Sequence, residues 1–148
     1  MSADLQPKPS RKAQRFIEKY LSNPGMRAAL RAGVAPKAFA LLETTGRKTG
    51  RRRQTPVGNG LDGDVFWLVS EKGYAAAYVR NLQANPRVRV KARRRWRTGI
   101  ATILPDDDGW ERREQIDVRN GRMGKLDGVI FRASATAPLT IRIDLDKD

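Results

Sequence analysis

The sequence predicts a mainly β protein, in which a small barrel of antiparallel strands carries short helices on its surface. About six segments have strand character, and short turns separate most of them, so neighbouring strands run antiparallel. The 148 residues suffice for one domain with a real core. Hydrophobic residues make up 39% of the chain, which is typical of a globular protein. No apolar run approaches the roughly 20 residues of a membrane helix.

The chain divides into a short lead and one domain. Residues 1–9 contain two prolines and little that can pack, so we expect a flexible lead followed by a single domain over residues 10–148. Ser10 can cap an amphipathic helix with an apolar stripe of Ala13, Phe16, Ile17, Tyr20 and Leu21. The N-terminus lacks the apolar core of a secretion signal. We therefore expect a cytoplasmic protein, and the basic helix leaves peripheral contact with the inner face of an anionic membrane open.

Apolar patterning predicts strands at residues 38–44, 54–60, 65–70, 87–93, 96–104 and 139–145. The dipeptide Asp62-Gly63 is typical of a hairpin turn. Residues 87–93 alternate between apolar and cationic side chains, which predicts one buried face and one cationic face. Helices are expected at residues 75–84 and 110–118, and the glycine-rich stretch 120–124 is expected to be a loose loop.

The charge of the chain restricts its function. Thirty Lys and Arg residues against 16 Asp and Glu residues give a net charge of +14. Five cations lie within residues 47–53 and seven within residues 87–97, so this basic protein attracts polyanions in particular directions. Nucleic acid, an anionic membrane and a phosphorylated cofactor all fit. Because the chain has no Cys and no His, thiolate and imidazole metal ligands and His-based triads are excluded, and no metal site is expected.

The segment from residue 41 to residue 56 has the features of a phosphate site. An apolar strand leads into a turn that contains Gly46 and Gly50, and glycines allow the backbone to approach a ligand closely. The turn holds five cations and several threonine hydroxyls. Forked guanidinium donors, hydroxyls and free backbone N–H groups suit a phosphate. A solvated turn with incidental arginines has the same composition and stays an alternative.

Two motifs resemble one known family. Residues 44–50, TTGRKTG, followed by Arg53 and Pro56, resemble the signature of the deazaflavin-dependent nitroreductases, also described as F420H2-dependent quinone reductases. Residues 78–86, YVRNLQANP, resemble that family's (W/Y)-x-x-N-L-x-A-N-P segment, in the right order and at the right separation. The resemblance covers roughly residues 38–104. It implies a split β-barrel of the flavin-reductase type that binds the deazaflavin cofactor F420, and such barrels often form homodimers.

The resemblance also implies roles for individual residues. Lys48 and Arg53 would be the main contacts of the cofactor's phosphate and acidic tail. Ser70 and Tyr78 are the candidates, beside solvent, for protonating the product. The full set expected to contact the cofactor is Arg47, Lys48, Thr49, Arg53, Pro56, Val57, Ser70, Lys72, Tyr78 and Asn81.

The chain departs from the family pattern on the substrate side. The best-known type has Trp at the position of Tyr78 and lines its substrate pocket with tyrosines from a C-terminal helix, whereas no tyrosine follows Tyr78 here. The pocket must therefore differ. Residues 122–131 are expected to line it, with Met123, Leu126 and Phe131 as apolar candidates.

The predicted function is hydride transfer from reduced F420 to a small-molecule acceptor, namely a quinone, a nitroaromatic or a similar electron-poor compound. One alternative is an FMN-binding reductase of the same fold, because Arg and Lys would recognise its phosphate in the same way. A second, less favoured alternative is a nucleic-acid-binding module, in which the cationic strand 87–93 follows a phosphate backbone and Trp96 stacks on a base.

Overall fold

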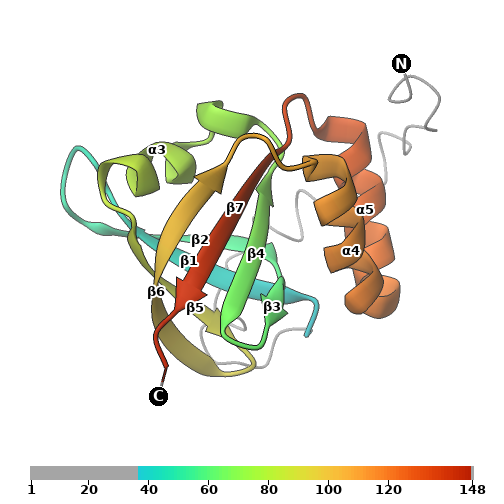
Figure 1. Cartoon of the computed structure of the whole chain (residues 1–148), viewed down its shortest axis with the longest axis horizontal. Coiled ribbons are helices and arrows are strands. Elements are labelled where there is room, and N and C mark those ends of the chain that lie inside the picture. Colours follow the sequence, from blue (N-terminus) through green and yellow to red (C-terminus); the bar gives the residue numbers. More distant parts are fainter. Residues whose placement is uncertain (1–36, 148) are drawn as a thin grey trace.

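The computed structural model describes residues 37–147 and forms one curled antiparallel sheet with helices at its margins (Figure 1). The 3₁₀ turn η2 spans Gly73–Ala75. The helices are α3 (Ala77–Ala84), α4 (Gly109–Arg119) and α5 (Gly121–Ser134). The strands are β1 (Phe39–Thr45), β2 (Arg52–Gly58), β3 (Leu61–Asp62), β4 (Val65–Ser70), β5 (Arg87–Ala92), β6 (Arg95–Leu104) and β7 (Leu139–Leu145).

The sheet closes part of the way into a barrel. Its strand order is β2-β1-β5-β6-β7-β4-β3, and every neighbouring pair is antiparallel. The expected mainly β, antiparallel fold is thereby confirmed. Short hairpins join β1 to β2, β3 to β4 and β5 to β6, whereas β7 returns after the helix pair α4–α5 to pair between β6 and β4.

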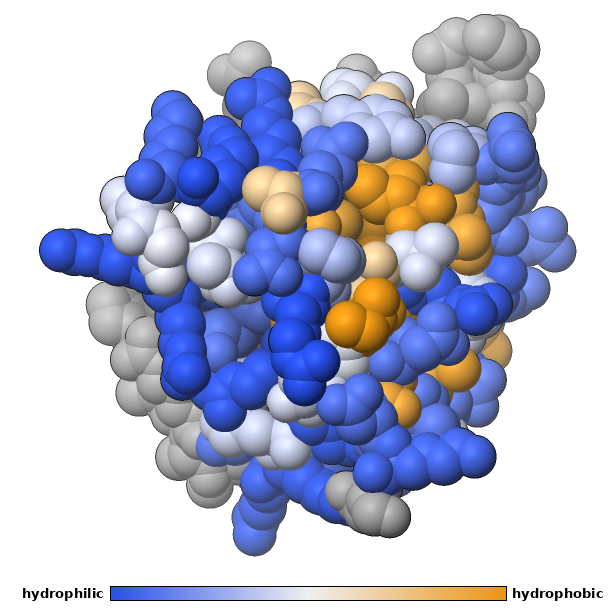
Figure 2. Space-filling view, turned by 60° about the vertical axis from the view of Figure 1, so that its left-hand side comes forward, coloured by the Kyte–Doolittle hydropathy of each residue, from blue (hydrophilic) through white to orange (hydrophobic). Residues whose placement is uncertain are grey.

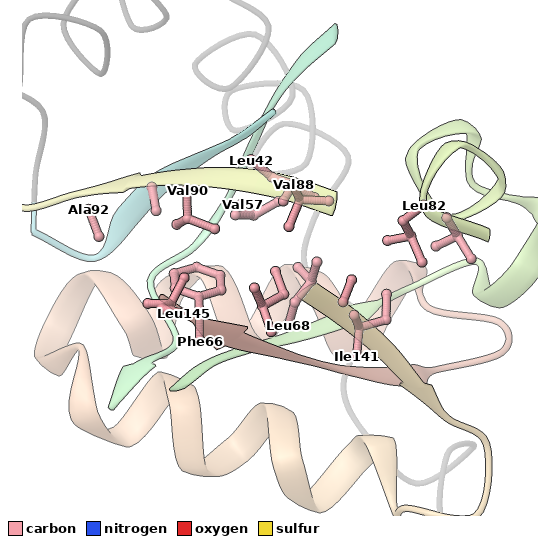
Figure 3. Packing of buried hydrophobic residues seen from close by; sticks show 14 of the residues in the cluster. Leu42, Val57, Phe66, Leu68, Leu82, Val88, Val90, Ala92, Ile141 and Leu145 are labelled. Carbon is pink, nitrogen blue, oxygen red and sulfur yellow. The ribbon is translucent and has the colours of Figure 1, made fainter. Parts of the chain in front are cut away.

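The core fills the space inside the curl (Figure 3). Leu42, Val57 and Val90 come from one side of the curl and face Phe66 and Ile141 from the other side. All of them are less than 10% exposed. The inward face of β5 is apolar and its outward face cationic, as its alternation predicted. Burial of apolar surface at about 25 cal/mol per Å² therefore holds the two sides together.

The helix pair α4–α5 packs on the outer face of β4. Phe131 and Ile116 bury themselves against Val69, and Figure 1 shows both helices beside β4, away from the β1–β2 loop. Asp108 caps α4, because its carboxylate accepts hydrogen bonds from the backbone N–H groups of Trp110 (3.1 Å) and Glu111 (3.2 Å).

Three expectations need correction or stand untested. Residues 120–124 are not a loose loop, because α5 begins at Gly121. The second strand covers Arg52–Gly58, two residues earlier than predicted, and leaves residues 59–60 outside it. At Gly60 a Cβ atom would lie 1.7 Å from the Trp67 carbonyl oxygen, so only glycine allows this close approach of the two backbones. The predicted lead and amphipathic helix lie outside the described residues.

Candidate functional site

A cavity of about 320 Å³ opens where β2 passes the end of β4. Its lining comes from distant parts of the chain: residues 55–58 of β2, residues 68–72 at the end of β4, Phe39, Ala76, Tyr78, Arg113 and Asp127. Much of this lining is apolar, with polar side chains at a few points, which is the usual composition of a small-molecule site. The predicted contacts Pro56, Val57, Ser70, Lys72 and Tyr78 all line this cavity.

Ser70 and Tyr78 form a polar point in the cavity wall. The Ser70 hydroxyl is fully buried and donates a hydrogen bond to the Gly73 carbonyl oxygen at 3.0 Å. Burial raises the pKa of the Tyr78 hydroxyl to about 12, although its hydrogen bond with the Ser70 side chain lowers that pKa. Tyr78 therefore stays neutral at physiological pH. It is a weak acid, and its hydroxyl is already engaged in the hydrogen bond with Ser70.

The cationic loop, residues 46–51, connects β1 to β2. Gly46 and Gly50 close it, since Gly46 N–H donates to the Arg51 carbonyl (2.7 Å) and Gly50 N–H donates to the Gly46 carbonyl (2.8 Å). Gly50 has a φ of 72°, which glycine adopts most readily. Thr49 is part of the closure, because its hydroxyl oxygen accepts a hydrogen bond from Arg51 N–H at 3.2 Å. The loop is thus a preformed turn with cations pointing outward.

Asn81 ties this loop to helix α3. Its side-chain oxygen accepts hydrogen bonds from the Arg47 backbone (3.2 Å) and guanidinium (3.0 Å), and its amide nitrogen donates to the Thr44 hydroxyl (3.2 Å). Asn81 is buried and outside the cavity lining. The structure therefore places Asn81 and Arg47 where they position the loop.

The other loop cations remain available for a ligand. In the described part of the chain, no carboxylate pairs with Lys48, Arg51 or Arg53, and all three side chains are exposed. Figure 2, which brings this side of the molecule forward, shows a mostly hydrophilic face with a smaller apolar area set among it. Residue Arg53 lies on β2 only two residues before the cavity lining begins. Strand β2 thus connects the cationic loop to the cavity.

The second cationic segment is partly neutralised. Glu43 is buried and accepts hydrogen bonds from Arg89 Nε (2.8 Å) and Gln54 Nε2 (3.1 Å). Burial raises the pKa of Glu43, but the hydrogen bonds from Arg89 and Gln54 prevail and hold it below its usual value. The Arg89 guanidinium also lies 4.6 Å from the centre of the Trp96 ring. One face of that ring is therefore covered by Arg89 and is not free to stack on a base, which argues against the predicted role of Trp96 in a nucleic-acid-binding module.

A buried ionic cluster forms the far wall of the cavity. Arg113 of α4 is 9% exposed and donates from Nε to both carboxylate oxygens of Asp117 (3.0 and 3.1 Å). Its Nη2 donates to Asp127 of α5. Burial raises the pKa of Asp117 to about 6, even though the Arg113 charge lowers it. One guanidinium cannot neutralise two carboxylates, so the direction of this shift is expected.

Comparison with known proteins agrees with this geometry. The model of the F420H(2)-dependent quinone reductase family matches residues 15–128, which is most of the chain. The chain belongs to this family. It is 30% identical over 105 residues to an F420H(2)-dependent quinone reductase of Mycobacterium tuberculosis, a match that covers 68% of this chain and 70% of that protein.

Solved structures show the fold of this reductase. An F420-H2 dependent reductase superposes with a TM-score of 0.52 at 20% identity, covering 74% of this chain and 95% of the other. A protein described as a domain-swapped dimer superposes with a TM-score of 0.54 at 19% identity, covering 90% and 95%. The fold is the split β-barrel predicted from the motifs. Family membership makes the chain an oxidoreductase with F420 as its cofactor.

The residues present fit such a cofactor. The loop cations, which have no carboxylate partner among residues 37–147, suit its phosphate and acidic tail, and the cavity beside Pro56 and Val57 offers an apolar surface for its ring. Sequence reasoning missed Arg113 and Asp127, which the fold brings into the cavity wall. The expected pocket residues Met123, Leu126 and Phe131 do not line the cavity. Within the described residues, no helix is long and apolar enough to cross a membrane.

Proposed function

We propose that this reductase uses reduced F420 to reduce a quinone bound in the cavity between β2, the end of β4 and helix α4. The observation that carries the proposal is the continuity of β2. Its first residues follow the cationic loop, and residues 55–58 line the cavity. One elongated ligand with an anionic tail and a flat ring can therefore contact both. Nitroaromatics and other electron-poor compounds are further candidate acceptors.

Side chains at different positions of the site contact different parts of the cofactor. Lys48 and Arg53 bind the anionic part of the cofactor, with assistance from Arg47 and Thr49, and set its affinity. Pro56 and Val57 lie along the ring, while Ser70 and Lys72 approach its polar edge. When bound, the reduced cofactor supplies the hydride.

The protein orients the acceptor and limits the access of water. Tyr78 packs in the cavity wall as a neutral side chain, and its hydroxyl is held by the hydrogen bond with Ser70. Because burial raises the pKa of its hydroxyl to about 12, solvent is the better source of any proton that the product needs.

Two titrations test the cofactor. Oxidised F420 and FMN are each added to the purified protein at low and at high salt, and binding is followed by fluorescence. We expect F420 to bind tightly, with an affinity that falls with salt, and FMN to bind much more weakly. Steady-state rates with a quinone and with a nitroaromatic then identify the acceptor class. Tight FMN binding without F420 binding would contradict the proposal and support the FMN alternative.

A double substitution tests the cationic loop. In the Lys48→Ala/Arg53→Ala variant we expect F420 affinity to fall at least tenfold. Each charge-assisted hydrogen bond is worth about 1.5–3 kcal/mol, and solvent screening at this exposed loop lowers that value. The Arg122→Ala/Lys125→Ala variant is the matched control, because it removes two exposed positive charges from α5, on the other side of the molecule (Figure 1). Unchanged affinity in the loop variant would remove this site assignment.

The partners of the reductase are also part of the proposal. We expect a homodimer, which is supported by the dimeric description of one structural neighbour. Light scattering on the purified protein measures this directly, and a monomer at micromolar concentration would contradict it. Contact with an anionic membrane at the cytoplasmic face is supported by the net charge of +14. Co-sedimentation with vesicles of 30% phosphatidylserine, compared with neutral vesicles, tests it.

A further inference from the structure

Arg113 is the one buried cation among the described residues that line the cavity, and its position requires an explanation. It is 9% exposed, whereas the other lining cation, Lys72, is exposed. A buried guanidinium is costly to desolvate and is kept where it is fully hydrogen-bonded or where it acts on a ligand. The Arg113 Nε group donates hydrogen bonds to the Asp117 carboxylate, and its Nη2 group donates one to Asp127. These bonds fix the plane of the guanidinium at the cavity wall.

Strand β2 leaves room for this group. Gly58 lines the cavity, and a Cβ atom built there would lie 3.6 Å from Asp127 Oδ2 and 3.7 Å from Arg113 Nη2. The guanidinium therefore stands directly over β2, one residue beyond Val57. Because Gly58 has no side chain, nothing on that residue separates the Arg113–Asp127 pair from a molecule that lies along the strand.

The other polar groups of the wall suit an acceptor oxygen less well. The Ser70 hydroxyl donates its proton to the Gly73 carbonyl oxygen. The Tyr78 hydroxyl is held by its hydrogen bond with the Ser70 side chain. Arg113 carries a full positive charge and lines the same cavity beside Gly58.

On the basis of the proposed function, we propose that Arg113 binds a carbonyl oxygen of the quinone and stabilises the negative charge that develops there as the hydride arrives. Reduction adds one hydride with its electron pair and one proton to the quinone. Both C=O groups become C–OH groups: the reduced cofactor would supply the hydride and release one proton to solvent, and solvent would supply the proton that the product takes up. Asp117 and Asp127 are positioning residues, which hold the guanidinium in place.

The charges of the cluster also set the acceptor class. One guanidinium pairs with two carboxylates, those of Asp117 and Asp127, so the cluster carries no net positive charge. A neutral quinone can accept a hydrogen bond from Arg113 without facing net repulsion. A sulfonated or carboxylated quinone places a second anion near Asp127 and is disfavoured.

Arg113→Lys tests the contact, with Arg112→Lys as the matched control. Arg112 is the preceding residue of the same helix and pairs with a single carboxylate, that of Asp107 (3.1 and 3.2 Å). It stacks 3.8 Å from the centre of the Trp67 ring and lines a separate hollow on the outside of α4. Both substitutions keep the charge and remove the planar fork. Circular dichroism and thermal unfolding establish that each variant folds.

Two measurements decide the outcome. The first is binding of 2-methyl-1,4-naphthoquinone to the protein loaded with oxidised F420, in which no turnover occurs. The second is kcat and KM for the same quinone with reduced F420. We expect Arg113→Lys to weaken quinone binding and to lower kcat, each about tenfold, while the dissociation constant of F420 changes less than twofold. Arg112→Lys should change none of these more than twofold.

Asp127→Asn keeps Arg113 and provides a second, independent test. We expect it to raise kcat/KM for 1,4-naphthoquinone-2-sulfonate relative to the neutral quinone at least fivefold, because one repelling charge is removed. An unchanged ratio between the two quinones would overturn the proposal, as would wild-type quinone binding in Arg113→Lys. If the wild-type protein binds no F420, the proposed function itself fails. Quinone reduction that does not respond to Arg113 overturns only this further inference.

Discussion

The protonation of Asp117 depends strongly on folding. Asp117 faces Arg113 on its own helix and Asp127 and Arg132 on α5, and burial raises its pKa to about 6, against about 3.9 in an unfolded chain. The folded state therefore holds this proton more tightly. The contribution of Asp117 to stability is fully present below pH 4 and is lost as pH rises through 6.

We therefore expect the wild-type free energy of unfolding, compared with that of Asp117→Asn, to decrease by about 1–3 kcal/mol between pH 4 and pH 7. Urea unfolding of both proteins across this range measures the difference. Folding lowers the pKa of other groups, such as Glu43 and Asp107. These groups are present in both proteins, so their contributions to the pH dependence of stability cancel in the comparison. Parallel stability curves for the two proteins would show that Asp117 has no raised pKa.

Gly128 tests how tightly the same cluster is packed. A glycine in the interior of a helix costs about 1 kcal/mol relative to alanine, so Gly128→Ala should stabilise an isolated helix. In this fold a Cβ at Gly128 would lie 2.4 Å from Asp117 Oδ2 and would push that carboxylate away from Arg113. We expect the variant to be destabilised by about 1–3 kcal/mol in urea unfolding. Val129→Ala, at the neighbouring exposed position, should change stability by less than about 0.5 kcal/mol.

These residues also show where sequence reasoning ends. Arg113 and Asp117 are four apart on a helix that the sequence predicted, and that spacing is typical of an ion pair. The pattern carries no sign that both side chains are buried, because charged residues are normally exposed. Asp127 comes from α5, and only the packing of α5 against α4 brings it to Arg113. A contact that depends on tertiary packing is not visible in local spacing.

At the scale of elements, α5 was missed for a physical reason. Gly121 and Gly124 are weak helix formers, and their density predicts a loop. In the structure a Cβ at Gly124 would lie 2.2 Å from the Asp117 carbonyl oxygen, so the glycine allows α5 to pack closely against α4. Tertiary packing thus overrides intrinsic propensity. The strands were easier to predict, since β5 and β7 alternate with a period of two that follows their burial.

The hairpin between β5 and β6 contains a local conflict between sequence and backbone. Arg93 and Arg94 have φ angles of 52° and 70°, a left-handed conformation that asparagine and glycine adopt more easily than arginine. We expect Arg93→Asn to raise the free energy of unfolding by about 0.5–1 kcal/mol, because it relieves this strain. The urea midpoint should rise with an unchanged m-value. Arg87→Asn, on the exposed face of β5 where φ is ordinary, is the control and should not stabilise the protein.

At the scale of the whole molecule, the net charge of +14 attracts any polyanion, whereas a binding site with a defined geometry selects one ligand. The cationic loop and α5 lie on opposite sides of the molecule (Figure 1). The loop variant and the α5 variant described above each lose two positive charges. If binding of nucleic acid arises only from the overall field, both variants should lose affinity for a single-stranded DNA oligonucleotide to the same extent, and both affinities should fall steeply with salt.

The same two variants should differ in their affinity for the cofactor. We expect F420 affinity to fall at least tenfold in Lys48→Ala/Arg53→Ala and less than twofold in Arg122→Ala/Lys125→Ala, measured by fluorescence titration at one salt concentration. The reason is geometric: Lys48 lies in the loop closed by Gly46 and Gly50, Arg53 lies just after that loop on β2, and β2 leads into the cavity. Equal losses of F420 affinity would mean that the overall field holds the cofactor. A selective loss in the loop variant would mean that the loop holds the anionic end of the cofactor.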